Sequence, residues 1–426
     1  MSTTLTEVCL AIVDCEHKTA LAGDGFALSV GTKAMKAGRL ALGACKPVSE
    51  DTYDLWTRRL VPEEGDLILA REAPVGDVIR VPKDPRVCLG QRTVLIRPDP
   101  ECVDPRFLHY WLLGPTAQAV MHARAAGATV PHLNVEDIRA LDVSVLPVDL
   151  DFQRNAGSIL GAIDDLIENN RRRIALLERL AQAIYREWFV HFRYPGHEDD
   201  ELVHSPLGRI PAGWEVMKLG TVVETQYGFT DSATQSPEGP RFLRVTDINK
   251  RSYISWPDVP YCSQGVPDKF LLHEGDVVIA RMADPGKIGI VERDVSAVFA
   301  SYLVRLRPTA SWLRAYYLYF AVAGAAYQEF VLGASTGTTR ESISAKVMED
   351  GLIVKPTVDI LDAFVEAVVP MRRALTALAQ EAERLAGIRD LLLPKLVTGA
   401  IDVSHLDLDA LLDGKASADY LSEGDN

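Results

Sequence analysis

The sequence lacks the short motifs that mark common catalytic and nucleotide-binding sites. It contains no G-x-x-x-x-G-K-[ST] phosphate loop, no G-x-G-x-x-G after a strand-like run, no H-E-x-x-H and no G-x-S-x-G. The loop "GASTGTTRES" (333–342) has two glycines but neither the lysine nor the spacing of a nucleotide-binding loop. These absences argue against nucleotide hydrolases, dinucleotide-dependent oxidoreductases, zinc proteases and serine hydrolases.

Paired cysteines, a leader sequence and long apolar runs are also missing. The six cysteines are scattered without a C-x-x-C pair, so we expect no bound metal and reduced thiols. The N-terminus carries Glu7 and Asp14 and no basic region, which does not fit a secretory signal. No apolar run is long enough to span a bilayer. Together these features predict a cytoplasmic protein.

The composition that is present fits a globular protein of two or three domains. The chain has 426 residues, of which 47% are hydrophobic and 24% charged, so it can bury sizeable cores. The formal net charge of -14 argues against a protein that binds nucleic acid over its whole surface. Local basic faces remain compatible with this charge, because contact depends on the local field.

The sequence repeats itself once. "EEGDLILARE" (63–72) matches "HEGDVVIARM" (273–282), and "VLIRPDP" (94–100) matches "VRLRPTA" (304–310), both displaced by 210 residues. A longer segment that ends in proline, at Pro147 and at Pro356, also recurs. A period of this length indicates two duplicated domains. In each copy β-like runs precede a helix, a small-residue loop, a short helix and a last strand, which predicts a compact α+β domain.

A long helical pattern with a coiled-coil seam follows each domain. The apolar positions advance by alternating steps of three and four, which indicates helices that pair with each other. An antiparallel pairing would place the two domains at opposite ends; the alternative is that each helix packs on its own domain. We expect Asn170 on the seam to fix the register and Pro370 to kink or weaken the second helix. The seam residues are Leu160, Ile163, Ile167, Asn170, Ile174, Leu177, Ala181, Ile184 and Trp188, and then Leu361, Phe364, Val368, Met371, Leu375, Leu378, Ala382, Leu385 and Leu392.

These features resemble the specificity subunit of type I restriction-modification systems. The resemblance rests on "LPVDLDFQRNAGSILGAIDDLIENNRRRIALLERLAQAIYREWFVHF", on "AGIRDLLLPKLVTGAIDV" and on the strand-turn pair "GDLILARE" and "GDVVIARM". It covers nearly the whole chain. Pro147 and Gln153 mark the start of the first helix, whereas Pro356 is followed by "TVDILDAF" without the glutamine. This departure leaves the start of the second helix in doubt.

The resemblance implies an α+β fold in which two similar α/β target-recognition domains are joined by two long antiparallel coiled-coil helices, as a pseudo-twofold internal repeat. We assign residues 1–147 to the first recognition domain, 148–195 to the first conserved helical region, 196–214 to a linker, 215–355 to the second recognition domain, 356–397 to the second conserved helical region and 398–426 to an acidic C-terminal tail.

The resemblance also implies a function. Each recognition domain would read one half of a bipartite double-stranded DNA site, and the helices would set the spacer and dock partner subunits. The chain itself would catalyse nothing and bind no cofactor. Its partners would be two modification subunits, which are adenine-N6 methyltransferases that use S-adenosylmethionine, and restriction subunits that use ATP and Mg²⁺.

Both halves contain side chains of the types that contact DNA. Lysine, arginine and hydroxyl groups bind phosphates, and arginine, lysine, asparagine, glutamine, serine and threonine bind base edges. For each basic residue a solvated surface role is the alternative. The candidates are Lys33, Lys36, Arg39, Arg71, Thr129 and His132 in the first half, and Arg241, Arg244, Lys250, Arg281, Lys287, Thr338, Thr339 and Arg340 in the second.

Several candidates carry a more specific expectation. The alternation of Leu67 and Leu69 suggests a strand buried on one face, so that Arg71 and its counterpart Arg281 emerge at the strand end. His132 aligns with Glu341, and a catalytic role present in one copy alone is disfavoured. Other repeated residues are predicted to be structural: Asn134 and Ser344 as helix N-caps, and Arg97 and Arg307 beside turns.

Two other classes of function compete with DNA recognition. A non-enzymatic coiled-coil scaffold with two protein-binding modules would show the same repeat. An enzyme fused to a recognition module is disfavoured because methyltransferase and nuclease motifs are missing. Charge reversal of Arg281 would abolish target methylation only if the chain reads DNA.

Overall fold

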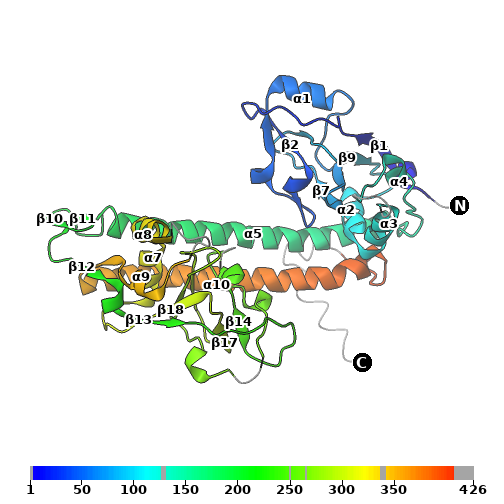
Figure 1. The fold of residues 1–426 in the computed structure, drawn as a ribbon. Helices are drawn as coiled ribbons and strands as arrows, with labels where there is room; N and C mark the ends of the chain where they lie inside the picture. Colours follow the sequence, from blue (N-terminus) through cyan, green and yellow to red (C-terminus); the bar gives the residue numbers. More distant parts are fainter. Residues whose placement is uncertain (1–2, 126–130, 249–250, 264–265, 336–341, 407–426) are drawn as a thin grey trace. The chain divides into compact units, whose positions relative to one another are not determined.

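The chain folds into two compact units, each of which contains one globular domain and parts of both long helices (Figure 1). The structure, a computed structural model, describes residues 3–125, 131–248, 251–263, 266–335 and 342–406. Unit 1 extends to Ile167 and resumes at Glu383, and unit 2 extends from Glu168 to Ala382. No helix of the described residues is long and apolar enough to cross a membrane.

A four-stranded antiparallel sheet forms the centre of unit 1. Its strands, in order across the sheet, are β1 (Cys9–Asp14), β9 (Thr93–Pro98), β6 (Leu67–Arg71) and β7 (Val75–Arg80). A second sheet contains β5 (Lys46–Val48), β2 (Ala27–Val30) and β8 (Val87–Leu89), and a short hairpin contains β3 (Met35–Lys36) and β4 (Arg39–Leu40). Strands β2 and β8 run parallel, whereas the other pairs are antiparallel.

Helices cover one face of the central sheet of unit 1. They are α2 (Pro105–Leu113), α3 (Pro115–Ala125), α4 (Val135–Arg139) and the long α5 (Leu150–Phe189), whereas α1 (Glu50–Thr57) packs against the second sheet. Leu67 and Leu69 pack with α2 and α5 on this face, while Ile68 and Ala70 pack against the second sheet on the other. All of β6 is therefore buried, which explains the apolar run from Leu67 to Ala70 that precedes Arg71.

Unit 2 repeats this architecture. Its central sheet has the order β13 (Val223–Tyr227), β18 (Leu303–Pro308), β15 (Val277–Ala280) and β16 (Ile288–Ile290), and β14 (Arg241–Leu243) pairs in parallel with β17 (Ala297–Phe299). Its helices are α6 (Val245–Ile248), α7 (Ala315–Ala323), α8 (Ala325–Ser335), α9 (Ala345–Glu349) and α10 (Val358–Val397). Strands β12 (Glu215–Lys218) and β19 (Leu352–Lys355) pair beside the central sheet.

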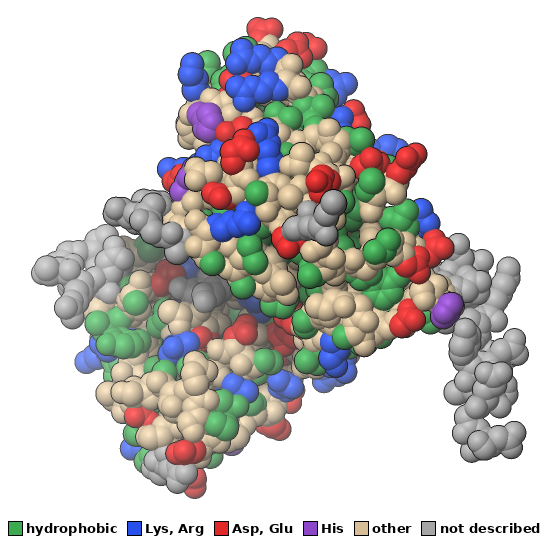
Figure 2. All heavy atoms as spheres, turned by 90° about the vertical axis from the view of Figure 1, so that its right-hand side faces the viewer, with side chains coloured by type: hydrophobic (Ala, Val, Ile, Leu, Met, Phe, Trp, Pro, Cys, Tyr) green, Lys and Arg blue, Asp and Glu red, His purple; other side chains and the backbone are tan. Residues whose placement is uncertain are grey.

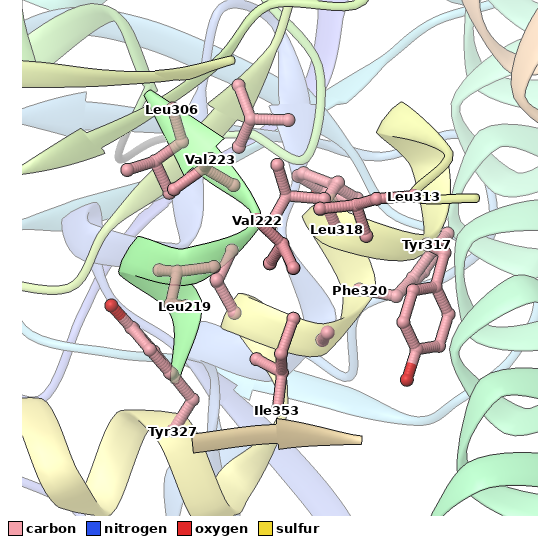
Figure 3. Close-up of a cluster of buried hydrophobic side chains, with 14 of the residues drawn as sticks. Leu219, Val222, Val223, Leu306, Leu313, Tyr317, Leu318, Phe320, Tyr327 and Ile353 are labelled. Atoms are coloured by element: carbon pink, nitrogen blue, oxygen red, sulfur yellow. The ribbon is translucent and has the colours of Figure 1, made fainter. Parts of the chain in front are cut away.

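The core of unit 2 lies between its central sheet, α7 and the long helices. Figure 3 shows part of this core, in which Val222 and Val223 meet Leu306 and Leu318. Tyr317 is buried there and donates a hydrogen bond of 2.5 Å to the carbonyl of Val354. The buried aromatic side chains thus tie α7 to β19.

One detail of the sequence-based prediction is wrong. The single helix predicted in each domain is in fact two helices. The backbone becomes extended at Gly114, between α2 and α3, and at Gly324, between α7 and α8. The predicted linker at 196–214 contains a hairpin of β10 (Leu202–Ser205) and β11 (Gly208–Pro211). Its turn needs the left-handed conformation of Gly208 (φ +96°).

The repeated Asp and Arg residues form the same buried ion pair in both units. Arg97 donates to both carboxylate oxygens of Asp66 at 2.9 and 2.7 Å, and Arg307 donates to Asp276 at 2.8 Å twice. Asp66 is 4% exposed and Asp276 is 3% exposed. The prediction that Arg97 and Arg307 are structural is confirmed, and burial of the pair explains why both positions recur.

A repeated glutamine joins the second helix of each domain to the sheet. Gln118 in α3 donates to the carbonyl of Gly76 at 2.7 Å, and Gln328 in α8 donates to that of Gly286 at 3.0 Å. Both glycines have φ near +90°. The repeat thus preserves turn geometry as well as strands.

The long helices pack together in an antiparallel manner within each unit. In unit 1 the start of α5 packs with the end of α10, whereas in unit 2 the end of α5 packs with the start of α10. Seam residues such as Leu160 and Leu375 are fully buried, and α10 is continuous through Pro370. Asn170 is 4% exposed and donates to Glu381 Oε2 at 3.1 Å. The predicted coiled-coil pairing is confirmed.

Candidate nucleic-acid interface

In unit 1 four strands and two loops meet at one edge of the central sheet, which we call loop edge 1. Here β1 ends at Asp14, β6 ends at Arg71 and β9 begins directly after the turn 90–92. Residues 131–134 lie at the same edge, where His132 forms a β-bridge with Glu72. Loop edge 1 therefore gathers side chains from segments that are far apart in the sequence.

Unit 2 has an equivalent edge, which we call loop edge 2. It contains the ends of β13 and β15, the turn 300–302 and Ser342, which forms a β-bridge with Met282. The amide of Arg281 donates to the carbonyl of Tyr302 at 2.9 Å, as the amide of Arg71 donates to that of Arg92. The bridges make Ser342, and not Glu341, the counterpart of His132, which corrects the sequence alignment.

Two polar depressions lie side by side on loop edge 1, because Gln91 and Arg92 line both. The smaller, of about 210 Å³, is also lined by His17, Arg71, Glu72 and His132. The larger, of about 420 Å³, is lined mostly by small residues together with Lys33 and Lys46, and the ammonium group of Lys46 donates to the carbonyl of Ala20 at 2.6 Å. This surface offers amide, guanidinium, imidazole and ammonium groups, which are the donors used in nucleic-acid contacts.

Arg71 is held inside loop edge 1 by a salt bridge. Its Nη1 atom lies 2.7 Å from both carboxylate oxygens of Asp14, and its side chain is 9% exposed. The expectation that Arg71 emerges at the strand end is therefore wrong. The reason is that the sheet of β5, β2 and β8 covers the second face of β6, so that the strand end is buried as well.

His132 extends this network toward the surface. Its Nε2 atom accepts from Nη2 of Arg71 at 2.9 Å, and its Nδ1 atom lies 3.4 Å from Oε2 of Glu72. The side chain is 33% exposed, so one side of the ring faces the smaller depression. His132 is thus placed for contact with a ligand, whereas Arg71 supports it from beneath.

The three other candidates of unit 1 divide between two places. Lys33 is exposed in the short helix 32–34 and lines the larger depression of loop edge 1. Lys36 is exposed on the β3–β4 hairpin. Arg39 in the same hairpin lies with its Nη2 atom 2.8 Å from Oδ1 of Asp164 in α5, so it binds the helix.

Two basic candidates of unit 2 have internal partners. Arg241 donates to the carbonyl of Val259 at 2.5 Å and lies over the ring of Tyr261, 4.1 Å from its centroid. Arg244 forms a bidentate pair with Asp247 at 3.0 and 2.9 Å, and its side chain is 39% exposed. Internal bonds therefore fix the position of both guanidinium groups.

Arg281 and Lys287 lie at the turn between β15 and β16. Arg281 is half-buried on loop edge 2, where its guanidinium lies 5.1 Å from the centroid of the Tyr227 ring. Lys287 is exposed and lines a depression of about 430 Å³ together with Arg251 and Glu178 of α5. Five other candidates, Thr129, Lys250, Thr338, Thr339 and Arg340, lie outside the described residues.

Sequence reasoning missed the two turns that the loop edges display most openly. Gln91 and Arg92 are exposed on loop edge 1, and Ser301 and Tyr302 occupy the same places on loop edge 2. The side chains of Arg92 and Tyr302 are 52% and 53% exposed. The repeat contained a signal, because it places "GQR" (90–92) opposite "ASY" (300–302), and these two turns share no residue although similar strands follow both.

The electrostatic surface is mixed. On the face of the molecule that Figure 2 draws, lysine, arginine and histidine side chains are intermingled with acidic ones among the described residues. Such a surface agrees with the net charge of -14 and contrasts with the broad basic stripe of many nucleic-acid binders.

Comparison with known proteins shows a consistent similarity. The profile of the type I restriction modification DNA specificity domain matches residues 50–179. The type I restriction enzyme MjaIX specificity subunit of Methanocaldococcus jannaschii is 24% identical, over 84% of this chain and 82% of that protein. The chain is thus similar to type I specificity subunits over most of its length. The HindI specificity subunit of Haemophilus influenzae is 20% identical, over 74% of this chain and 81% of that protein.

A solved structure of a type I specificity subunit shares the fold. The S subunit from M. genitalium aligns with a TM-score of 0.59 over 93% of this chain and 96% of that chain, at 14% identity. The matched profile describes a DNA specificity domain and the relatives are named specificity subunits, which agrees with the prediction that this chain is not an enzyme. The fold class predicted from the sequence is confirmed.

Proposed function

We propose that this specificity subunit reads a bipartite DNA site, with each loop edge contacting one half-site. The observation that carries the proposal is the equivalence of the two turns. Residues 90–92 and 300–302 occupy the same place in the two domains and expose different polar side chains. A duplicated scaffold with different exposed residues suits two readers of different sequences.

The chemistry of the turns supports base contact. The guanidinium of Arg92 and the amide of Gln91 can form paired hydrogen bonds to guanine and adenine edges in the major groove. Ser301 offers a hydroxyl, and Tyr302 offers a hydroxyl and an aromatic face. Lys33 is exposed beside Gln91, where it can contact phosphate oxygens.

The remaining parts of the proposal follow from the family. The helices would set the spacer between half-sites and dock two modification subunits that use S-adenosylmethionine. Restriction subunits would use ATP and Mg²⁺, and the chain itself would bind no cofactor. The complex would act in the cytoplasm, where cellular DNA is accessible to it.

Mapping of methylated bases tests the proposal. The chain and its modification subunits would be expressed together, and the methylated motif would be determined for Arg92→Ala and for Tyr302→Ala. We expect each variant to relax one half of the motif and to leave the other half unchanged. The loss of one paired contact costs about 1–3 kcal/mol of discrimination against the wrong base.

The control is Lys83→Ala. Lys83 is an exposed cation beyond the opposite end of β7, away from loop edge 1. It should leave both halves of the motif unchanged. If Arg92→Ala and Tyr302→Ala also left the motif intact while the complex assembled, the loop edges would not be the readers. Absence of any methylated motif would favour the alternative, a coiled-coil scaffold with two protein-binding modules.

A further inference from the structure

Two buried charges of opposite sign occupy the same position in the two long helices. Asp164 is as many residues from Leu150, the first residue of α5, as Arg372 is from Val358, the first residue of α10. The side chain of Asp164 is 14% exposed and that of Arg372 is 1% exposed. A charge at this depth needs a complementary partner, so the residues that face each position are informative.

In unit 1 the recognition domain supplies two partners for Asp164. Arg39 Nη2 lies 2.8 Å from Oδ1, and the hydroxyl of Tyr110 donates to Oδ2 at 2.8 Å. Arg389 of α10 donates to Oδ1 at 3.0 Å. Burial alone would raise the pKa of Asp164, but Arg39, Tyr110 and Arg389 lower it below its ordinary value. We call these four residues seat 1.

In unit 2 the recognition domain supplies the opposite chemistry for Arg372. Nε and Nη2 donate to the two carboxylate oxygens of Glu292 at 2.8 and 3.0 Å, and Nη2 also donates to the carbonyl of Ser252 at 2.9 Å. The guanidinium lies 5.3 Å from the centroid of the Tyr319 ring. The side chain of Glu292 is 7% exposed. We call these four residues seat 2.

The domain residues that face the two positions differ at equivalent places. Tyr319 corresponds to His109 in the repeat, and Phe320 corresponds to Tyr110. Phe320 has no hydroxyl to donate to a carboxylate, whereas Tyr319 offers an aromatic face on which a guanidinium can lie. Each domain therefore carries side chains suited to the charge of its own helix.

We propose that Asp164 and Arg372 are positioning residues of opposite charge, each of which accepts only its own recognition domain and holds it in one orientation on the helices. An exchange of domains would bring Glu292 to Asp164 and Arg39 to Arg372, so that like charges would be buried together. The proposal rests on the proposed function in one respect: a fixed orientation of each reader fixes the spacing between half-sites.

A charge exchange in seat 2 tests the assignment. Arg372→Glu and Glu292→Arg each place two like charges in seat 2, whereas the double variant restores an opposite pair. We expect both single variants to lower the thermal midpoint of the full chain and the double variant to recover most of the loss. A double variant no more stable than the worse single variant would overturn the assignment.

A conservative variant tests the positioning role without loss of charge. Arg372→Lys keeps the charge but loses the bidentate geometry, and Arg373→Lys alters an exposed neighbour as the control. In the chain alone we expect amide hydrogen exchange in residues 251–256 to become roughly tenfold faster in Arg372→Lys and to stay unchanged in Arg373→Lys. Unchanged exchange in Arg372→Lys would overturn the positioning role.

The same variant in the complex tests the link to spacing. We expect Arg372→Lys to methylate sites whose spacers differ by about one base pair from the wild-type spacer, with both half-site sequences unchanged. If exchange became faster in the chain alone but the spacer stayed unchanged, the result would still support the role of Arg372 in positioning the domain. It would contradict a role of that positioning in DNA spacing. The two failures are therefore distinguishable.

Discussion

At the scale of single residues, we expect a buried histidine in unit 1 to make stability depend on pH in acid. His109 is 4% exposed, and its buried Nδ1 atom has no hydrogen-bond partner among the described residues. Burial and the nearby charges of Arg80 and Arg39 lower its pKa to about 3, against the opposing effect of Asp164. The imidazole is therefore neutral in the folded chain at pH values where an unfolded histidine takes up a proton.

The sign of the resulting pH dependence follows from proton binding. Between about pH 6.5 and pH 3 the unfolded chain binds one more proton at His109 than the folded chain does, so the free energy of unfolding falls as the pH falls. The contribution is complete above pH 6.5 and decreases by up to about 1.4 kcal/mol per pH unit below it. We predict that His109→Gln flattens the pH dependence of urea unfolding between about pH 6 and pH 4.

The matched control is His122→Gln, because His122 is exposed on α3 in the same unit. This variant should keep the wild-type slope. A slope that is equally steep in His109→Gln and in the wild type would show that His109 is protonated in the folded chain.

Individual residues also show where sequence reasoning succeeded and failed. Ser344 caps α9 as predicted, since its hydroxyl accepts from the amide of Val347 at 3.3 Å. Asn134 stands at the N-cap position of α4, but its side chain bonds to Asp137 Oδ2 and caps no amide. Arg71 was misplaced because a sheet formed by distant segments buries it, and no local pattern reports such a layer.

At the scale of secondary-structure elements, the repeat and the heptad seam were sufficient to predict the fold. The strands and turns recur in part because each domain keeps the same ion pair, Asp66 with Arg97 and Asp276 with Arg307. The seam is visible because apolar residues recur at helical spacing. The seats were not predictable, because Arg39 and Asp164 are 125 residues apart and nothing in either segment identifies the other. The turns 90–92 and 300–302 were not predicted, because their residues do not match between the copies.

The helix pair allows a prediction at this scale. Asn170 is buried on the seam and binds the exposed Glu381, which gives a hydrogen bond worth about 0.5–1.5 kcal/mol. Burial of a leucine side chain at the same place contributes about 1.5–3 kcal/mol. We therefore predict that Asn170→Leu raises the free energy of unfolding by about 1 kcal/mol, measured by urea denaturation.

The neighbouring Asn169 provides the control, because it is exposed on the same helix. Asn169→Leu should change the free energy of unfolding by no more than about 0.5 kcal/mol. If Asn170→Leu instead lowered the free energy of unfolding by the predicted amount or more, the hydrogen bond to Glu381 would contribute more to stability than the burial of leucine at this position.

At the scale of the whole molecule, acidity and DNA recognition are compatible if affinity arises mainly in the assembled complex. The chain has a net charge of -14, and the described basic residues of the loop edges are few and partly paired. Most DNA affinity comes from phosphate contacts that release counterions. We therefore expect the isolated chain to contribute selectivity and little affinity, whereas the complex with modification subunits binds tightly.

This expectation gives a prediction for DNA binding by the chain alone. With a duplex that contains the methylated motif, fluorescence anisotropy should yield a Kd of about 10⁻⁶–10⁻⁴ M near physiological salt, close to the value for a scrambled duplex. The logarithm of the binding constant should fall steeply with the logarithm of salt concentration, with a slope of about 0.9 per phosphate contacted. The complex with modification subunits serves as the control and should discriminate strongly between the duplexes. Nanomolar, sequence-specific binding by the isolated chain would contradict this division, because the affinity would then have to come from the loop edges themselves.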